Sequence, residues 1–304
     1  MTASSESTAL VPLEMDVVDA EIVEEGVVSA FSGQYGIFHD VPEGAYHAHP
    51  ALSSTQLKWL LDSAARYRYN KDHPQPFKKA LDVGSATHVL VLGVGWGVVE
   101  LDYPDFRTKA AQAARDEAYA ANEIPMLSKD MAIVRGMAEA VLSDPDAREV
   151  LEGSSREVSV VARDAAAGLD LRCRFDVFQD DLSLVGDLKT SANRATKAGF
   201  SKAVADFKYD VSHEHYLDTL QLVAGERPEK RYIVVEKEAP YFTAVFKLSD
   251  DEIQMGRKEA RYARAVLMSS LESGIWPHRP LGVQTTEAPM RRIYEHIDRF
   301  KESA

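Results

Sequence analysis

The chain has 304 residues, of which 45% are hydrophobic and 27% charged, so it can bury a substantial core and fits one large domain better than two equal ones. Its formal charge of −13 at neutral pH argues at first sight against a nucleic-acid partner. A single cysteine, Cys173, excludes an intramolecular disulfide, a cysteine-rich zinc site and a four-cysteine iron–sulfur cluster, so oxygen and imidazole groups must hold any metal ion.

The first segment, residues 1–30, is predicted to be an acidic mobile arm. It is rich in Ser, Thr, Val and acidic residues without a sustained period. Residues 1–57 contain nine of the 48 acidic residues and no Lys or Arg, which leaves 39 acidic residues against 35 basic ones in the rest of the chain. The negative charge is therefore concentrated at the start. We expect neither a secretory signal nor a transit peptide there, no membrane role, and a cytoplasmic protein, in a bacterial host if phage-encoded.

The front half of the folded part is predicted to be mostly helical. A capping box at Ser53 and Gln56 opens a helix over about 54–69. A short helix follows the Asp144-Pro145 dipeptide, with Asp as the cap and Pro at its first position. The other helices are expected at about 80–92, which contains His88, at 108–121 and at 128–142.

The pattern changes to strands at Glu157. A three-stranded antiparallel meander is predicted over about 157–190, with turns at 164–168 and 179–181. Later elements are helices at about 194–207 and 212–224, strands at 231–236 and 241–247, and a long capped helix over 249–274. The layout predicts an α+β fold with a central mixed sheet flanked by helices. We place one domain at 31–280 and a C-terminal helical tail at 281–304.

Charged residues gather on one face of the last hairpin of this meander. If Asp180 and Asp181 form a two-residue turn, Asp176 lies opposite Val185, and Asp187 lies diagonal to Asp176 on the same face, roughly 7–8 Å away. Lys189 follows on that face. Two such carboxylates can chelate a hard cation such as Mg²⁺, and a metal ion with a lysine can neutralise a scissile phosphodiester.

The alternative for these residues is a solvated strand face with a weak salt bridge. The apolar residues that flank them favour an interior location, where three charged groups on one face need a purpose. The geometry depends on the turn, because a slip of one residue would move the side chains to opposite faces.

With these residues in place, the chain resembles the RecE-type (exonuclease VIII-like) exodeoxyribonucleases of phages and prophages, a RecB-like branch of the PD-(D/E)xK nucleases. The resemblance extends from about Tyr46 to about Trp276 and depends on short pieces that occur in the family's order. These pieces are Tyr46-His47, Ala51-Leu52-Ser53, Gly84 to Leu92, Pro104 to Ala111, Glu157, Gly168-Leu169, Arg172 to Asp176 and Asp187-Leu188-Lys189-Thr190.

The resemblance implies a restriction-endonuclease-like core in which His88, Asp176, Asp187 and the Leu188 carbonyl bind Mg²⁺, with Mn²⁺ expected to substitute. Lys189 would assist hydrolysis. On its own, His88 would be read as a core residue of an apolar helix.

Three further parts of the sequence have open interpretations. Glu157 begins a strand of unfixed register and is as well suited to face the site as to face away from it. Tyr216 fits a family position for DNA contact, but Ser212 stands where the family usually has Gln four residues earlier. His213 and His215, beside Tyr216, are expected at the solvent rather than on DNA. The Gly93–Gly97 segment lacks the third glycine of a dinucleotide fingerprint and is predicted to be a turn.

The leading hypothesis is a Mg²⁺-dependent exonuclease that acts on double-stranded DNA ends and supplies single strands for phage-type recombination. Its 5′ to 3′ direction comes from the resemblance, and its expected partners are DNA, a single-strand annealing protein and further copies of the chain. One alternative is an endonuclease or repair nuclease on the same core. Another is a non-catalytic DNA- or protein-binding module, against which the intact Asp176, Asp187 and Lys189 argue.

Overall fold

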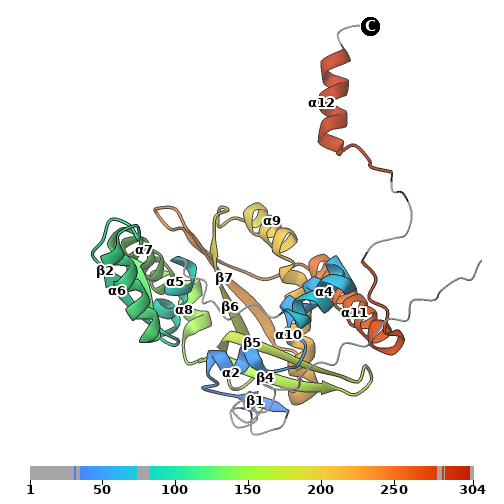
Figure 1. Cartoon of the computed structure of the whole chain (residues 1–304), viewed down its shortest axis with the longest axis horizontal. Helices are drawn as coiled ribbons and strands as arrows, with labels where there is room; N and C mark the ends of the chain where they lie inside the picture. The colour runs from blue at the N-terminus through green and yellow to red at the C-terminus, as the bar shows by residue number, and fades with distance from the viewer. Residues whose placement is uncertain (1–30, 32–34, 74–82, 279–282, 284, 302–304) are drawn as a thin grey trace, which may run out of the picture.

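The computed structural model describes residues 31, 35–73, 83–278, 283 and 285–301. The acidic arm predicted for residues 1–30 lies outside the described residues. A six-stranded sheet has the order β1-β4-β5-β6-β7-β8 and is antiparallel except between β6 and β7 (Figure 1). Its strands are β1 (Gly36–Phe38), β4 (Ser155–Asp164), β5 (Leu169–Phe178), β6 (Leu184–Ser191), β7 (Glu229–Glu236) and β8 (Thr243–Phe246). The predicted α+β class, mixed sheet and meander are confirmed.

Helices cover both faces of this sheet. The described helices are α2 (Glu43–Ala48), α3 (Ser54–Asp62), α4 (Ala64–Asp72), α5 (Val83–Leu92), α6 (Lys109–Ala120), α7 (Ser128–Ser143), α8 (Pro145–Leu151), α9 (Lys197–Phe207), α10 (Tyr209–Ala224), α11 (Asp250–Ser273) and α12 (Met290–Phe300). One apolar core joins α5, α7 and α8 to Leu188, Ile233 and Val235 of the sheet. A second joins α10 to Phe175 and Val185. Because side chains alternate along a strand, Val185 and Leu188 point to opposite faces of β6, so the sheet lies between two helical layers.

Two parts of the front half differ from the prediction. The helix expected over 54–69 is divided at Ser63, which has an extended backbone and caps α4 by accepting a hydrogen bond from the Arg66 N–H. Two short strands, β2 (Gly97–Leu101) and β3 (Glu123–Leu127), form a separate parallel pair that the pattern did not predict. The predicted turn is confirmed, since the chain from Gly93 to Trp96 connects α5 to β2 without forming an element.

The C-terminal helix α12 extends away from the rest of the molecule (Figure 1). All of its residues are exposed, including Ile293, Ile297 and Phe300. It lies within the helical tail predicted for 281–304. Among the described helices, none is long and apolar enough to cross a membrane.

Gly186 allows α8 to pack closely on the strand that carries the charged residues. A Cβ atom at this position would lie 2.9 Å from Val150 Cγ1 and 2.9 Å from Val177 Cβ. We expect Gly186→Ala to lower the free energy of unfolding by about 1–3 kcal/mol, as overpacking does in other cores. Urea unfolding would measure this. Gly44→Ala in α2, where a Cβ meets no atom within 4 Å, is the control and should not destabilise the protein. Equal stability of the Gly186 variant would show that α8 can move away from the sheet.

Candidate active site

The register of the β5–β6 hairpin places the two predicted aspartates across from each other rather than diagonally. Val177 pairs with Gly186 and Phe178 with Val185, so paired residue numbers sum to 363. The predicted two-residue turn, with a sum of 361, is wrong. The Gln179 N–H donates to the Leu184 carbonyl and the Leu182 N–H donates to the Gln179 carbonyl, so the turn contains two additional residues. A shift of two residues keeps the same faces, and Asp187 therefore follows the ladder directly across from Asp176 instead of diagonal to it.

The side chain of Asp176, on β5, contacts both β6 and His88 of α5. The Asp176 Oδ2 atom accepts a hydrogen bond from the Leu188 N–H at 2.8 Å, where the regular β5–β6 ladder has ended. The same oxygen lies 3.8 Å from Nδ1 of His88 on α5. Burial and the nearby Asp187 carboxylate raise the pKa of Asp176. The two aspartates therefore repel each other when both are ionised, as expected for carboxylates that share a site.

Asp187 is buried and lies between two lysines. Its Oδ1 atom accepts a hydrogen bond from Lys189, two residues along β6, and its Oδ2 atom lies 3.2 Å from Nζ of Lys230 on β7. Burial by itself raises the pKa of Asp187, but the two lysines outweigh it and lower the pKa below its ordinary value. Asp187 is thus held ionised. Burial by itself lowers the pKa of Lys189, but the charges of Asp187 and Asp176 outweigh it and raise the pKa of this lysine above its ordinary value.

The donor types suit a divalent cation. His88, Asp176 and Asp187 offer imidazole and carboxylate atoms, and the repulsion between the two carboxylates is what a cation would relieve. As the side chains lie, however, no group of three or more His, Cys, Asp or Glu residues within the described part of the chain is arranged to hold an ion. Asp187 contacts lysines while His88 contacts Asp176. Binding a metal ion would therefore require Asp187 to exchange a lysine contact for the metal.

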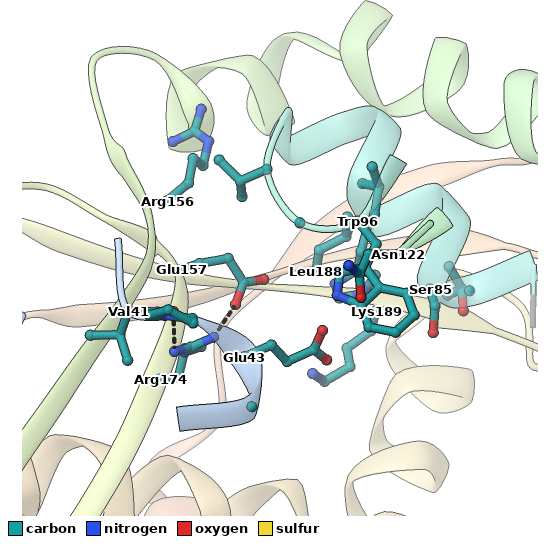
Figure 2. A pocket seen from close by; sticks show the side chains of 18 of the residues that line it. Val41, Glu43, Ser85, Trp96, Asn122, Arg156, Glu157, Arg174, Leu188 and Lys189 are labelled. Carbon is teal, nitrogen blue, oxygen red and sulfur yellow. Dashed lines mark hydrogen bonds and ion pairs between the residues drawn. The ribbon is translucent and has the colours of Figure 1, made fainter. Parts of the chain in front are cut away.

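A cavity of about 1100 Å³ opens beside these residues. Figure 2 shows Leu188 and Lys189 on one side of it with Trp96, Asn122 and Ser85, and Glu157, Arg174 and Glu43 on the other side. His88, Tyr209 and Lys237 also line it. Asp176 and Asp187 are not among the residues that line this cavity, so His88 and Lys189 are the side chains of the site that reach it.

Glu157 lies on the wall of this cavity. Its neighbours pair Arg156 with Val177 and Val158 with Phe175, so Glu157 occupies the β4 position across from Asp176. Its φ of 52° is in the left-handed region, which non-glycine residues rarely adopt, and the backbone is irregular there. The Glu157 Oε2 atom lies 3.8 Å from Nη1 of Arg174 (Figure 2). Of the two orientations left open by the sequence, the structure has the one that faces the cavity.

A family comparison agrees with this geometry. Residues 53–286 match the model of a family described as a PDDEXK-like domain of unknown function (DUF3799), which is more than half of the chain. The chain belongs to this family. The PDDEXK-like domain resembles the crystal structure of the "Putative exonuclease" from Eubacterium rectale, with a TM-score of 0.53, 12% identity, and coverage of 80% of this chain and 92% of that one. This likeness shows a shared fold.

Other comparisons with the PDDEXK-like domain are weaker. The crystal structure of SSO0001 is 16% identical and covers 71% of this chain and 85% of that one, but its TM-score of 0.26 is too low to indicate a common fold. No curated protein matches the sequence. The matched region, 53–286, begins at the Ser53 cap of α3 and ends before α12.

The sequence did not identify two neighbours of the site in this PDDEXK-like domain. The predicted strand begins at Arg231 and does not include Lys230, whereas β7 begins at Glu229 and Lys230 is 2% exposed. Tyr209, the first residue of α10, lines the cavity, and its ring centroid is 5.3 Å from Nζ of Lys189. A signal for Lys230 was present, because it shares the alternating pattern of Tyr232 and Val234, but a lone lysine at a strand end more commonly indicates solvent.

Three residues of α10 lie near the site rather than in solvent: His213 and His215 are buried, and Tyr216 is half-buried. Tyr216 packs on Phe175, with ring centroids 5.4 Å apart, and its ring lies 4.1 Å from Nζ of Lys230. The expectation that His213 and His215 face solvent is wrong. His213 Nδ1 lies 3.2 Å from the Tyr232 hydroxyl, and His215 Nε2 lies 2.9 Å from the Arg172 carbonyl. The helix is covered by both the sheet and α11, so the polar residues on these sides, His213 and His215 among them, are buried.

These buried histidines predict acid sensitivity. Burial lowers the pKa of each histidine to about 3 from the ordinary 6.5. The second cause is the positive charge of Lys230 for His213 and that of Arg264 for His215. Between these values the unfolded chain takes up protons that the folded chain does not, so acidification from pH 6.5 towards 3 destabilises the fold by about 1.4 kcal/mol per pH unit and histidine. In His215→Gln, the slope of unfolding free energy against pH should be smaller by that amount. Urea unfolding at several pH values measures it, and an unchanged slope would contradict the assignment.

Proposed function

We propose that the chain is a metal-dependent deoxyribonuclease that digests double-stranded DNA from its ends, in the 5′ to 3′ direction, and leaves single strands for recombination. The observation that carries this proposal is the placement of Asp176, Asp187 and Lys189 together on two adjoining strands beside a large cavity, with His88 reaching Asp176 from α5. Membership in a PDDEXK-like family supports the phosphodiester chemistry. The name of the Eubacterium rectale relative supports exonuclease action.

Each residue has a role in this chemistry. His88, Asp176 and Asp187 would hold the cation, and the Leu188 carbonyl is proposed as a further ligand. A bound Mg²⁺ or Mn²⁺ supplies Lewis-acid charge and a coordinated water. Lys189 is ionised, lies on the cavity wall, and can place its ammonium group against a phosphate oxygen whose negative charge grows during hydrolysis.

Basic side chains on the cavity wall suit a phosphate backbone. Arg156 donates to the Ser154 and Leu151 carbonyls, and Arg174 donates to the Val41 carbonyl and the Ser159 hydroxyl, so both guanidinium groups are held in place. Lys237 lines the same cavity. With Lys189, these cations compensate Asp40, Glu43 and Glu157 on the same wall, so the cavity is less acidic than the overall charge of −13 suggests.

The deciding experiment compares linear duplex DNA with covalently closed circular DNA of the same sequence. Purified protein is incubated with each substrate, with and without Mg²⁺ or Mn²⁺, and the linear substrate is labelled at the 5′ or the 3′ end. We expect metal-dependent loss of linear DNA alone, with early release of the 5′ label. Cleavage of the circle would instead indicate an endonuclease. Stable DNA binding without cleavage would indicate a non-catalytic module.

A further inference from the structure

Lys230 is a buried cation at the site that the proposed chemistry does not use. Its side chain has no exposed surface, and Nζ lies 3.2 Å from Oδ2 of Asp187. The atom makes no hydrogen bond of regular geometry, so the contact is an ion pair held by charge rather than by direction. Such a contact can be exchanged for another without losing a well-formed hydrogen bond.

The strand register fixes Lys230 at this position. In the parallel ladder, Tyr232 of β7 is the partner of Asp187, and Lys230 is the partner of Val185 two residues earlier. Residues two apart on a strand share a face, so Lys230 points to the side on which Asp187 lies. The rings of Tyr216 and Tyr232 lie 4.1 and 5.3 Å from its Nζ, and that of Phe175 lies 5.8 Å away. The three rings pack around the ammonium group, and the side chain of Lys230 is fully buried.

The carboxylates of the site are compensated by lysines without a metal ion. Lys189 and Lys230 both contact Asp187, and Lys58 is close enough to interact with its charge as well. A divalent cation that contacts Asp187 would come close to a fixed positive charge in a poorly hydrated surrounding, where charge repulsion is strong. Lys189 is on the cavity wall and can move towards a phosphate, but Lys230 is buried and does not line that cavity.

We propose that Lys230 is a positioning residue that takes the place of the metal charge in the metal-free protein. It keeps Asp187 paired and oriented, and by repulsion it makes metal binding weak until a phosphate brings further negative charge to the site. The inference rests on the metal site of the proposed function. Beyond the proposed function, the inference predicts that removal of Lys230 strengthens binding of the metal ion.

The test is calorimetric titration of Mn²⁺ into the full chain in the absence of DNA. Lys230→Met should bind Mn²⁺ at least about 10-fold more tightly than the wild type, because the loss of one fixed positive charge favours a cation. Lys230→Arg keeps the positive charge and should bind Mn²⁺ as weakly as the wild type. Lys247→Met is the matched control and should leave Mn²⁺ affinity unchanged, since Lys247 follows β8, is exposed, and pairs with Glu229 at 3.3 Å rather than with Asp187. Asp187→Asn should abolish the tighter binding in the Lys230→Met background.

Thermal unfolding gives a second readout that does not involve DNA. Mn²⁺ should raise the Tm of Lys230→Met more than that of the wild type, because a ligand stabilises the folded state in proportion to its affinity. Folding of this variant only when Mn²⁺ is present would also support the proposal. If Lys230→Met does not fold with or without Mn²⁺, the neutral polar variant Lys230→Gln replaces it in both measurements.

Two results would overturn the inference, and they differ in what they say about the proposed function. Equal or weaker Mn²⁺ binding by the folded neutral variant, with measurable binding by the wild type, removes Lys230 from control of the site and leaves the metal site intact. If neither protein binds Mn²⁺, both the role of Lys230 and the metal site are rejected.

Discussion

Replacement of Asp187 by Asn, or of Lys189 by Met, is expected to lower the rate of DNA cleavage by about 10²-fold or more. Asp187 is buried and ionised, and Asn at this position keeps its size but removes the charge that a cation would bind. Lys189 supplies a preformed positive charge, and the removal of one oriented electrostatic group commonly has an effect of this size. Initial rates of digestion of end-labelled linear duplex DNA measure both.

Matched controls are available on α9. Lys202 and Asp206 form an exposed ion pair one helical turn apart, so Asp206→Asn and Lys202→Met make the same chemical changes far from the cavity. Both controls should digest DNA at the wild-type rate. All four variants are compared at equal folded concentration, checked by circular dichroism. Wild-type rates in Asp187→Asn or Lys189→Met would remove that residue from the mechanism.

Local sequence signals were sufficient for much of the fold. The capping boxes at Ser53 and Ser249 and the Asp144-Pro145 pair mark helix starts that the structure confirms, because a side chain three residues from a backbone N–H can satisfy it without tertiary help. The meander was also predictable, since turn residues separate its three strands. The division of α3 from α4 at Ser63 was missed because the apolar repeat continues across it.

Long-range pairing explains the remaining errors. β2 and β3 have five residues each and are separated in sequence by α6. Their pairing therefore leaves no local pattern in either segment from which it could be predicted. The predicted hairpin turn is too short by two residues, but an even shift preserves faces, so the positions of Asp176, Asp187 and Lys189 still share one face. The ion pair of Asp187 with Lys230 crosses from β6 to β7, separated in sequence by two helices, and only the folded sheet brings them together.

His88 tests whether the imidazole belongs to the metal site or only to the packing of α5. Its side chain is 28% exposed and opens onto the cavity, so it is not enclosed as a core histidine would be. Neutral imidazole is a common ligand of transition metals and a less usual one for Mg²⁺. Mn²⁺ should therefore support cleavage at least as well as Mg²⁺.

In His88→Ala, we expect Mn²⁺ affinity to fall by about 10-fold or more, since even the loss of a group that only supports a ligand can lower metal affinity by 10–100-fold. Mg²⁺ affinity should fall less, because Mg²⁺ prefers the carboxylate oxygens that remain. Calorimetric titration of both ions measures the difference, and His39→Ala, at an exposed position outside the cavity, is the control. Because His88 is partly exposed, its removal should leave the helix content unchanged. Unchanged Mn²⁺ affinity in a folded His88→Ala protein would make the 3.8 Å approach of His88 to Asp176 a packing contact, and a metal ion would then have to be held by carboxylates alone.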